Sequence, residues 1–155
     1  MKLLVEGASR LSINLDKGQI ERFQLYYDEL IAWNENVNLT AVTGYEEVQA
    51  RHFLDSLIVG FALPTKVMDG RGKVLDVGTG AGFPGLPLKI AYPELDLTLL
   101  DATAKKTAFL SNVIETLVLD NVNVVTGRAE DEAHSVKKRE RFDVVISRAV
   151  ARLNV

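Results

Sequence analysis

The sequence contains no cysteine, only two histidines and no hydrophobic run as long as a membrane span. Without cysteine there is no disulfide framework and no thiolate metal site, which fits a reducing compartment, and we predict no metal site. The apolar run before the first acid consists only of Leu3, Leu4 and Val5, which is too short for a secretory signal. These absences predict a soluble, cytoplasmic protein that has no membrane partner.

A chain of 155 residues with 47% hydrophobic side chains can build one sizeable core. The net charge is −3, but residues 1–70 carry 6 Lys/Arg against 10 Asp/Glu, whereas residues 71–155 carry 12 against 11. The basic side chains of the second part cluster at Lys105-Lys106 and between Lys137 and Arg141. Charge runs are usually solvated surface, so this balance alone does not indicate a nucleic-acid binder.

Residues 1–70 are predicted to form an N-terminal helical cap. Apolar side chains recur at helical spacing over residues 20–31, with Asp16 as a candidate N-cap, and the asparagine-rich stretch 34–38 is expected to end this helix. A second helix is expected over about residues 46–59.

Residues 71–155 alternate between short apolar runs and helical patterns, which is typical of an α/β domain. The runs lie at 73–77, 95–100, 122–125 and 142–146, and the helices at 85–91 and 104–119. This pattern predicts a doubly wound, Rossmann-like parallel sheet with right-handed crossovers. Ending the sheet at its fourth strand would expose apolar faces and an edge, so we expect at least two further strands in the natural protein.

A glycine-rich loop follows the first predicted strand and precedes a helix, the setting in which backbone N–H groups meet a ligand. The spacing Gly80-x-Gly82-x-x-Gly85 matches a dinucleotide fingerprint, but the first glycine after the strand is Gly78 and an acid, Asp76, stands two residues before it. An acid there suits a ligand with an ammonium group and no pyrophosphate, such as S-adenosylmethionine. We expect Asp76 to act through water or to order the loop, and the glycines to let the cofactor approach closely. A plain tight turn is the alternative.

Other candidate cofactor residues follow the later strands. Asp101 ends the second strand, 19 residues after Gly82, where a carboxylate can accept both ribose hydroxyls of a nucleoside; a solvated acid is the alternative. Ala129 and Glu130 follow the third strand and could meet an adenine with backbone groups, or form an ordinary acidic helix start. Arg148 follows the fourth strand and is expected to pair with the cofactor carboxylate or a target phosphate, or else to form a surface salt bridge.

Seven motifs occur together along the chain: Trp33-Asn34, Asn38-Leu39-Thr40, His52-Phe53-x-Asp55-Ser56, Asp76 to Leu88, Leu100-Asp101 with Lys105-Lys106 and Phe109-Leu110, Arg128-Ala129-Glu130, and Ser147 to Ala151. Over about residues 15–155 the chain resembles the glucose-inhibited division protein B family, the small-subunit ribosomal RNA guanine-N7 methyltransferases.

The resemblance implies a seven-stranded S-adenosylmethionine-dependent methyltransferase sheet with an N-terminal helical cap. Only four strands are predicted here, so it also implies that C-terminal strands are missing. Small-subunit ribosomal RNA or a ribosomal particle is the implied partner, while the oligomeric state stays open. The residues matched to cofactor contacts are Gly78, Phe83, Ala129, Glu130 and Arg148, and Asp101 matches the ribose acid of the wider superfamily.

Guanine N7 is an acceptor nitrogen with no proton to remove, so its methylation needs alignment and electrostatics more than a general base. We therefore predict no catalytic residue. A methyltransferase with another substrate is the first alternative, because fold does not fix substrate. A nicotinamide-dependent oxidoreductase is the second, since both cofactors contain adenosine.

His52 is expected to join a helix-face network, His52 with Ser56 and Arg51 with Asp55, with substrate contact as the alternative. The aromatic side chains of the cap are expected to be core rather than base-stacking surfaces: Phe23, Tyr26, Tyr27 and Trp33. Three polar residues could border the cleft: Asn36, Asn38 and Thr40. Four basic residues near strand ends could share one RNA-facing side: Lys105, Lys106, Arg128 and Arg148.

Overall fold

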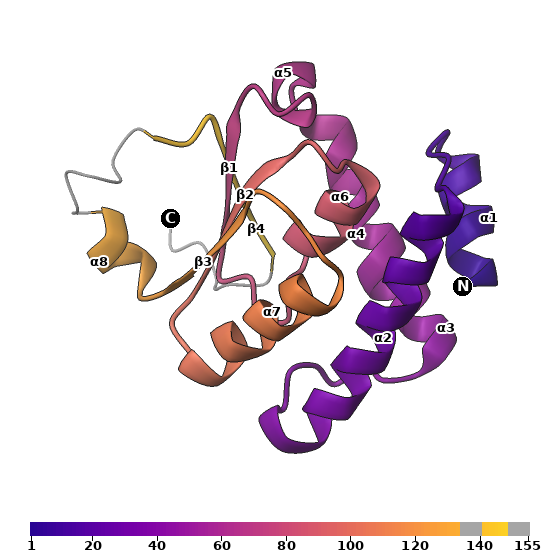
Figure 1. Ribbon diagram of the computed structural model, residues 1–155, viewed down its shortest axis with the longest axis horizontal. Helices are drawn as coiled ribbons and strands as arrows, with labels where there is room; N and C mark the ends of the chain where they lie inside the picture. The colour runs from indigo at the N-terminus through magenta and orange to yellow at the C-terminus, as the bar shows by residue number, and fades with distance from the viewer. Residues whose placement is uncertain (134–140, 149–155) are drawn as a thin grey trace, which may run out of the picture.

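The computed structural model describes residues 1–133 and 141–148, and a four-stranded parallel sheet lies at its centre (Figure 1). The strands are β1 (Lys73–Val77), β2 (Asp96–Asp101), β3 (Val122–Thr126) and β4 (Val144–Ser147). They lie in the order β3-β2-β1-β4, with every neighbouring pair parallel. The chain changes direction across the sheet at β1, and doubly wound sheets bind ligands at such a point, outside the carboxyl ends of the strands.

Two helices, α6 (Gly85–Ala91) and α7 (Ala104–Thr116), connect the first three strands. α6 packs on β2, and α7 packs on β2 and β3. Because both crossovers run in the same direction along the sheet, right-handed connections place both helices on the same face. Leu97 and Leu99 of β2 are fully buried there. A short helix, α8 (Ala129–Ala133), follows β3.

The cap begins with α1 (Lys2–Arg10) and α2 (Lys17–Val37), and α2 packs on both α6 and α7. Figure 1 shows these two helices as a separate layer, with α6 and α7 between them and the sheet. The predicted N-cap is confirmed: Asp16 Oδ1 accepts from the Gln19 N–H, and Gln19 Oε1 accepts from the Asp16 N–H, both at 2.8 Å. This reciprocal pair is a capping box.

The prediction that the stretch 34–38 ends the first long helix is confirmed, and the end lies at the last residues of that stretch. α2 continues to Val37, and Asn38 adopts the left-handed conformation with φ 51° that commonly ends a helix. Asn34 does not compete with the helix backbone, because its side-chain oxygen accepts from the Thr40 N–H at 2.9 Å, beyond the helix end.

The second helix that the sequence predicted for the cap follows α2. It runs without a break through three segments: α3 (Tyr45–Val48), the π-helical η1 (Gln49–Leu54) and α4 (Asp55–Val59). This agrees with the helix expected over residues 46–59, although nothing in the sequence pattern predicted the π-helical turns. Such turns are frequent at functional sites. A 3₁₀ turn, η2 (Gly60–Ala62), and the short α5 (Thr65–Met68) then lead to β1.

Cap and sheet share one hydrophobic core, which includes Phe23, Phe53, Leu88 and Phe109. Polar contacts reinforce the junction. The buried Gln19 side chain donates to the carbonyl oxygens of Ile90 and Ala91, at 2.9 and 3.0 Å, and so caps the end of α6. The cap is therefore packed as an integral part of the folded molecule.

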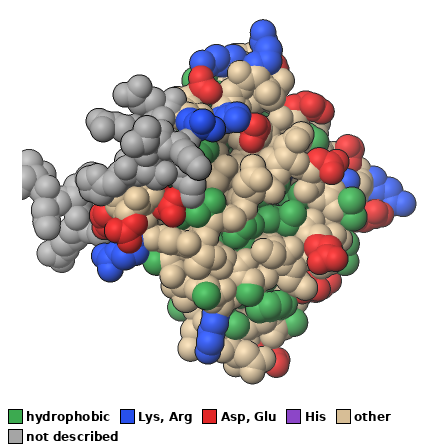
Figure 2. Space-filling view, turned by 60° about the vertical axis from the view of Figure 1, so that its left-hand side comes forward, with side chains coloured by type: hydrophobic (Ala, Val, Ile, Leu, Met, Phe, Trp, Pro, Cys, Tyr) green, Lys and Arg blue, Asp and Glu red, His purple; other side chains and the backbone are tan. Residues whose placement is uncertain are grey.

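The opposite face of the sheet is less covered. Val145 is 60% exposed, and the nearby residues of the adjacent strand β1, Leu75 and Val77, are only half-buried. Figure 2, which brings the α8 side forward, shows hydrophobic side chains at the surface and basic and acidic side chains in small separate groups. No helix in the described part of the chain is long and apolar enough to span a membrane.

Element boundaries moved slightly from the sequence-based expectation. The helix expected to reach residue 119 ends at Thr116, and Val118 has a positive φ of 51°. β2 and β4 are shifted toward the C-terminus by one or two residues relative to their predicted spans. The basic residues 137–139 and residues 149–155, which include the end of the Ser147 to Ala151 motif, lie outside the described residues.

Candidate functional site

The loops that follow the strands converge at the carboxyl edge of the sheet. The N–H groups of Gly78 and Thr79 both donate to the carbonyl oxygen of Leu100, at 2.8 and 3.1 Å, which ties the glycine loop to the end of β2. The Gly127 N–H donates to the Asp101 carbonyl oxygen at 3.0 Å, which ties the loop after β3 to the same strand. The sequence-predicted residues after β1, β2 and β3 are thus brought together.

Asp76 is fully buried beneath the glycine loop and orders it. Its Oδ2 accepts from the Thr79 hydroxyl at 2.7 Å and from the Gly85 N–H at 2.9 Å, so one carboxylate oxygen joins both ends of the loop. Its Oδ1 is buried without a hydrogen-bond partner among the described residues. Burial raises the pKa of Asp76 to about 6, although the Thr79 and Gly85 hydrogen bonds oppose this rise.

The loop glycines have positive φ angles, 65° at Gly78, 61° at Gly80 and 95° at Gly82, which only glycine adopts without strain. Gly82 is also closely packed: a Cβ there would lie 2.5 Å from Leu86 Cδ1 and 2.7 Å from the Tyr26 hydroxyl. A Cβ on Gly80 would meet nothing nearer than the Gly78 carbonyl oxygen, 4.0 Å away. Gly80 therefore faces open space, while Gly82 faces the cap.

Asp101 is the last residue of β2 and is 7% exposed. Its Oδ2 accepts from the Gly80 N–H at 3.0 Å, and its Oδ1 accepts from the Thr103 N–H at 2.9 Å. The side chain is therefore fixed by the glycine loop on one side and by the start of α7 on the other, and it is not a freely solvated strand-end acid. Each oxygen keeps a further lone pair for a ligand hydroxyl.

Ala129 and Glu130 form the first turn of α8. Glu130 is exposed and lies 3.7 Å from the Arg128 guanidinium, while Ala129 is partly buried. The short helix begins at the same sheet edge as the glycine loop, but neither side chain is held in place by a buried partner. Any contribution to a ligand site would come from their backbone, as the sequence suggested.

Tyr26 of the cap was expected to be core, and its ring is indeed fully buried, stacked with Phe53 and Phe83 at centroid distances of 5.4 and 5.5 Å. No pattern in the sequence indicated a second role for this tyrosine. The Tyr26 hydroxyl donates to the Ala81 carbonyl oxygen, so a cap side chain supports the glycine loop from below. Burial, followed by the nearby Asp76 charge, raises the pKa of Tyr26 well above its usual value, so this hydroxyl keeps its proton.

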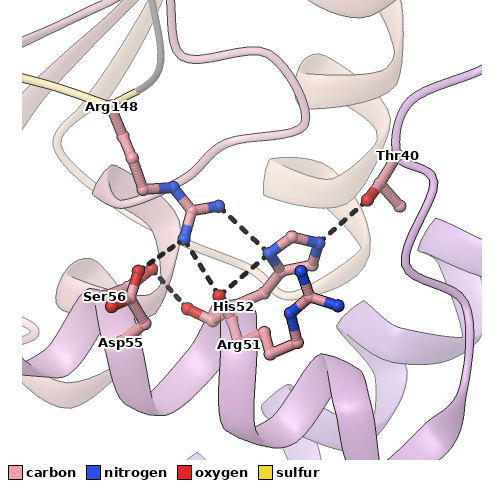
Figure 3. Close-up of polar contacts among 6 residues, drawn as sticks. All are labelled: Thr40, Arg51, His52, Asp55, Ser56 and Arg148. Atoms are coloured by element: carbon pink, nitrogen blue, oxygen red, sulfur yellow. Dashed lines mark hydrogen bonds and ion pairs between the residues drawn. The ribbon is translucent and has the colours of Figure 1, made fainter.

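Arg148, after β4, turns toward the cap (Figure 3). Its Nη1 donates to Asp55 Oδ2 at 2.9 Å and to the Arg51 carbonyl oxygen at 3.2 Å, and its Nη2 lies 3.1 Å from His52 Nδ1. The guanidinium also stands 5.1 Å above the Phe83 ring. The ion pair that the sequence left open as an alternative is present, and it lies beside the glycine loop rather than on a remote surface.

The network expected around His52 is partly wrong. Arg51 pairs with Glu47 at 3.6 Å, not with Asp55, and the Ser56 hydroxyl donates to the His52 carbonyl oxygen, not to its ring. The ring instead lies 2.9 Å from the Thr40 hydroxyl and 4.4 Å from the Phe83 ring. The i to i+4 rule pairs residues along one helix, so it could not predict that Asp55 pairs with Arg148, more than ninety positions away.

Residues 19–155 match the family model described as GidB, rRNA small subunit methyltransferase G. The chain belongs to the GidB family. It is 51% identical to the ribosomal RNA small subunit methyltransferase G of Lachnoclostridium phytofermentans over 148 residues, 96% of this chain and 60% of that protein. It is 47% identical to the enzyme of the same name from Caldanaerobacter subterraneus subsp. tengcongensis over 155 residues, 100% of this chain and 64% of that protein.

Two solved structures share the fold of this GidB chain. The O-methyltransferase from Bacillus cereus, in complex with SAH, has a TM-score of 0.57 and 20% identity, and the match covers 94% of this chain and 60% of that one. A protein from Plasmodium falciparum, described as a putative protein-L-isoaspartate O-methyltransferase in complex with S-adenosyl-L-homocysteine, has a TM-score of 0.52 and 14% identity, over 93% and 71% of the two chains. The predicted Rossmann-like methyltransferase fold is confirmed.

The chain spans about 60 to 64% of the length of the two curated GidB relatives named above. The family resemblance inferred from the scattered motifs is confirmed, including the N-terminal motifs in the cap. The individual assignments of cofactor contacts are not tested by these similarities and stay predictions.

Proposed function

We propose that this protein is an S-adenosylmethionine-dependent methyltransferase that modifies N7 of a guanine in small-subunit ribosomal RNA. Membership of the GidB family over residues 19–155 carries the proposal. In it, residues 1–70 act as a helical cap and residues 71–155 as the cofactor-binding part. Ribosomal RNA, free or within a particle, is the partner, and the cytoplasm is the expected location.

The described residues fit this cofactor. Gly80 faces open space, and Asp101 is held at the end of β2 with free lone pairs for ribose hydroxyls. Close to the loop, one buried oxygen of Asp76 has no hydrogen-bond partner in the part of the chain that the structure describes. An unpaired carboxylate oxygen favours a ligand that carries a positively charged amine, directly or through water. We assign the cofactor contacts to Gly78, Gly80, Phe83, Asp101, Ala129, Glu130 and Arg148.

The proposed methyl transfer to guanine N7 requires little of the side chains beyond alignment of the reacting groups. When bound, S-adenosylmethionine supplies the sulfonium methyl group, and guanine N7 carries no proton that must be removed. The glycine loop and Asp101 hold the nucleoside part, while Arg148 pairs with the carboxylate of the methionyl part. This division of roles needs no general base, in agreement with the absence of a proposed catalytic residue.

Calorimetry with S-adenosylhomocysteine and with NAD tests the cofactor. We expect binding of the first alone, and binding of NAD alone would favour an oxidoreductase instead. Transfer of labelled methyl groups by the natural full-length protein to small ribosomal subunits, free RNA and small metabolites tests the substrate. Label confined to a metabolite would support the alternative methyltransferase.

Arg148→Ala tests the assignment of the arginine. Losing a charge-assisted pair to a carboxylate should weaken S-adenosylhomocysteine binding about tenfold or more. Lys66→Ala is a matched control, since Lys66 is a cation paired with a carboxylate, Asp143, near the amino ends of the strands. Unchanged affinity in Arg148→Ala would remove the residue from the site.

A further inference from the structure

We propose that a short segment of the cap, Arg51 to Asp55, is a seat that positions Arg148, with His52 and Asp55 as its positioning residues. The inference rests on the proposed function, because it assumes that Arg148 binds the cofactor carboxylate. The seat is built from three acceptors: the Arg51 carbonyl oxygen, His52 Nδ1 and the Asp55 carboxylate. Two of them belong to the π-helical turns of η1.

The three contacts leave one edge of the guanidinium available. Nη1 donates to two acceptors and Nη2 to one, so three of the five N–H donors are engaged. Nε has no hydrogen-bond partner among the described residues. Figure 3 shows the contacts on the side of Arg148 that faces η1 and α4, with Nε turned away from them. Together with the second N–H of Nη2, Nε forms an edge that can bind a carboxylate through two parallel hydrogen bonds.

His52 can accept from Arg148 only as a neutral ring with its proton on Nε2. An arginine is purely a donor, so Nδ1 must present its lone pair, and Nε2–H then donates to the Thr40 hydroxyl at 2.9 Å. The Arg51 carbonyl oxygen, 3.2 Å from Nδ1, consequently accepts from Arg148 rather than from the ring. Burial, and then the Arg148 charge, lower the pKa of His52, which favours this neutral form.

Phe83 of the glycine loop completes the seat. Its ring stacks on the His52 imidazole at 4.4 Å and lies 5.1 Å below the Arg148 guanidinium. The planar groups of His52 and Arg148 thus share one aromatic support. Because Arg148 is held by contacts from η1, α4 and the loop, its side chain is ordered before a ligand arrives, which reduces the entropy that binding must overcome.

A matched pair of substitutions separates positioning from packing. In His52→Asn the amide oxygen stands near the place of Nδ1 and can still accept from Arg148, whereas His52→Gln places its amide near Nε2, toward Thr40. Both remove the stack on Phe83. We expect His52→Gln to weaken S-adenosylhomocysteine binding about tenfold and His52→Asn less than threefold, at similar thermal stability of the two variants. Equal losses in both would refute the seat and leave His52 a packing residue.

Acidity offers a readout that packing alone would not move. Protonation of His52 replaces the Nδ1 acceptor with a donor next to Arg148, so the affinity of the wild-type protein should fall as the pH drops through the lowered pKa of His52, below the usual range of a histidine. The charged groups facing the ring are Arg148, the residue after β4, and Arg51 and Asp55 from the same continuous helix as His52. Burial raises the pKa of Asp76 to about 6, but Asp76 titrates in His52→Asn as well, so the difference between the two profiles reports His52. Identical profiles would overturn the proposal.

The Arg148→Ala variant separates the assignment of Arg148 to the cofactor from the role of the seat. If Arg148→Ala binds S-adenosylhomocysteine as tightly as the wild type, the assignment of Arg148 to the cofactor fails and the seat fails with it. If Arg148→Ala weakens binding while Asp55→Asn and His52→Gln do not, the cofactor assignment stands and the seat alone is refuted.

Discussion

Two glycines two positions apart should respond very differently to the same substitution. At Gly82 an alanine Cβ would come within 2.5 Å of Leu86 and 2.7 Å of the Tyr26 hydroxyl, at a φ of 95°. Backbone strain of about 1–3 kcal/mol and overpacking of about 1–3 kcal/mol predict that Gly82→Ala lowers the free energy of unfolding by about 2–6 kcal/mol. That is a large share of the roughly 5–15 kcal/mol typical of a domain.

At Gly80 the same change meets open space. Its φ of 61° lies in the left-handed region, so an alanine costs about 1–2 kcal/mol, part of which is recovered because the unfolded chain becomes less flexible. Gly80→Ala should therefore stay folded, with its main effect on S-adenosylhomocysteine binding. Urea unfolding followed by far-UV circular dichroism measures both variants. Equal destabilisation, or a greater loss in Gly80→Ala, would refute the packing described for the loop.

Two further predictions concern the residues that support this loop. Burial raises the pKa of Asp76 from 3.8 to about 6, so the folded state binds the proton more tightly and the free energy of unfolding should fall by about 2 kcal/mol as the pH rises from 4 to 6.5. Asp76→Asn should lack this fall in parallel urea titrations, and a variant with the wild-type slope would show that Asp76 titrates normally. Tyr26→Phe leaves the buried Ala81 carbonyl oxygen without its donor, so we expect a loss of about 1–3 kcal/mol in urea unfolding; no loss would mean that water replaces the hydroxyl.

Local sequence signals predicted the parts of the molecule whose causes are local. The capping box at Asp16, the strand and helix order and the register of the glycine loop depend on residues within a few positions of one another. Parallel strands bring their carboxyl ends to one edge, so the convergence of Asp101 with the glycine loop could also be predicted from the order of elements.

Contacts between distant segments could not be predicted in the same way. Arg148 contacts Asp55 and His52 because the fold places the residue after β4 beside η1 and α4, and no periodicity of the sequence encodes that approach. The Tyr26 hydroxyl is a similar case, since a tyrosine on the buried face of a helix looks the same whether or not its hydroxyl meets a carbonyl group. The π-helical turns of η1 are a further feature that no periodicity of the sequence predicted.

The contact between Tyr26 and the glycine loop has a consequence for how the protein tolerates mutation. Tyr26 of the cap supports the glycine loop, and its ring packs on Phe53, which in turn packs on Phe23. A substitution that disturbs the packing of Phe23 or Phe53 therefore also shifts Tyr26 and, with it, Ala81 and Gly82. Inactivating substitutions collected at random should therefore fall across both segments, in proportion to buried side chains. The mutational target for loss of function is then much larger than the short glycine motif by which the site is recognised.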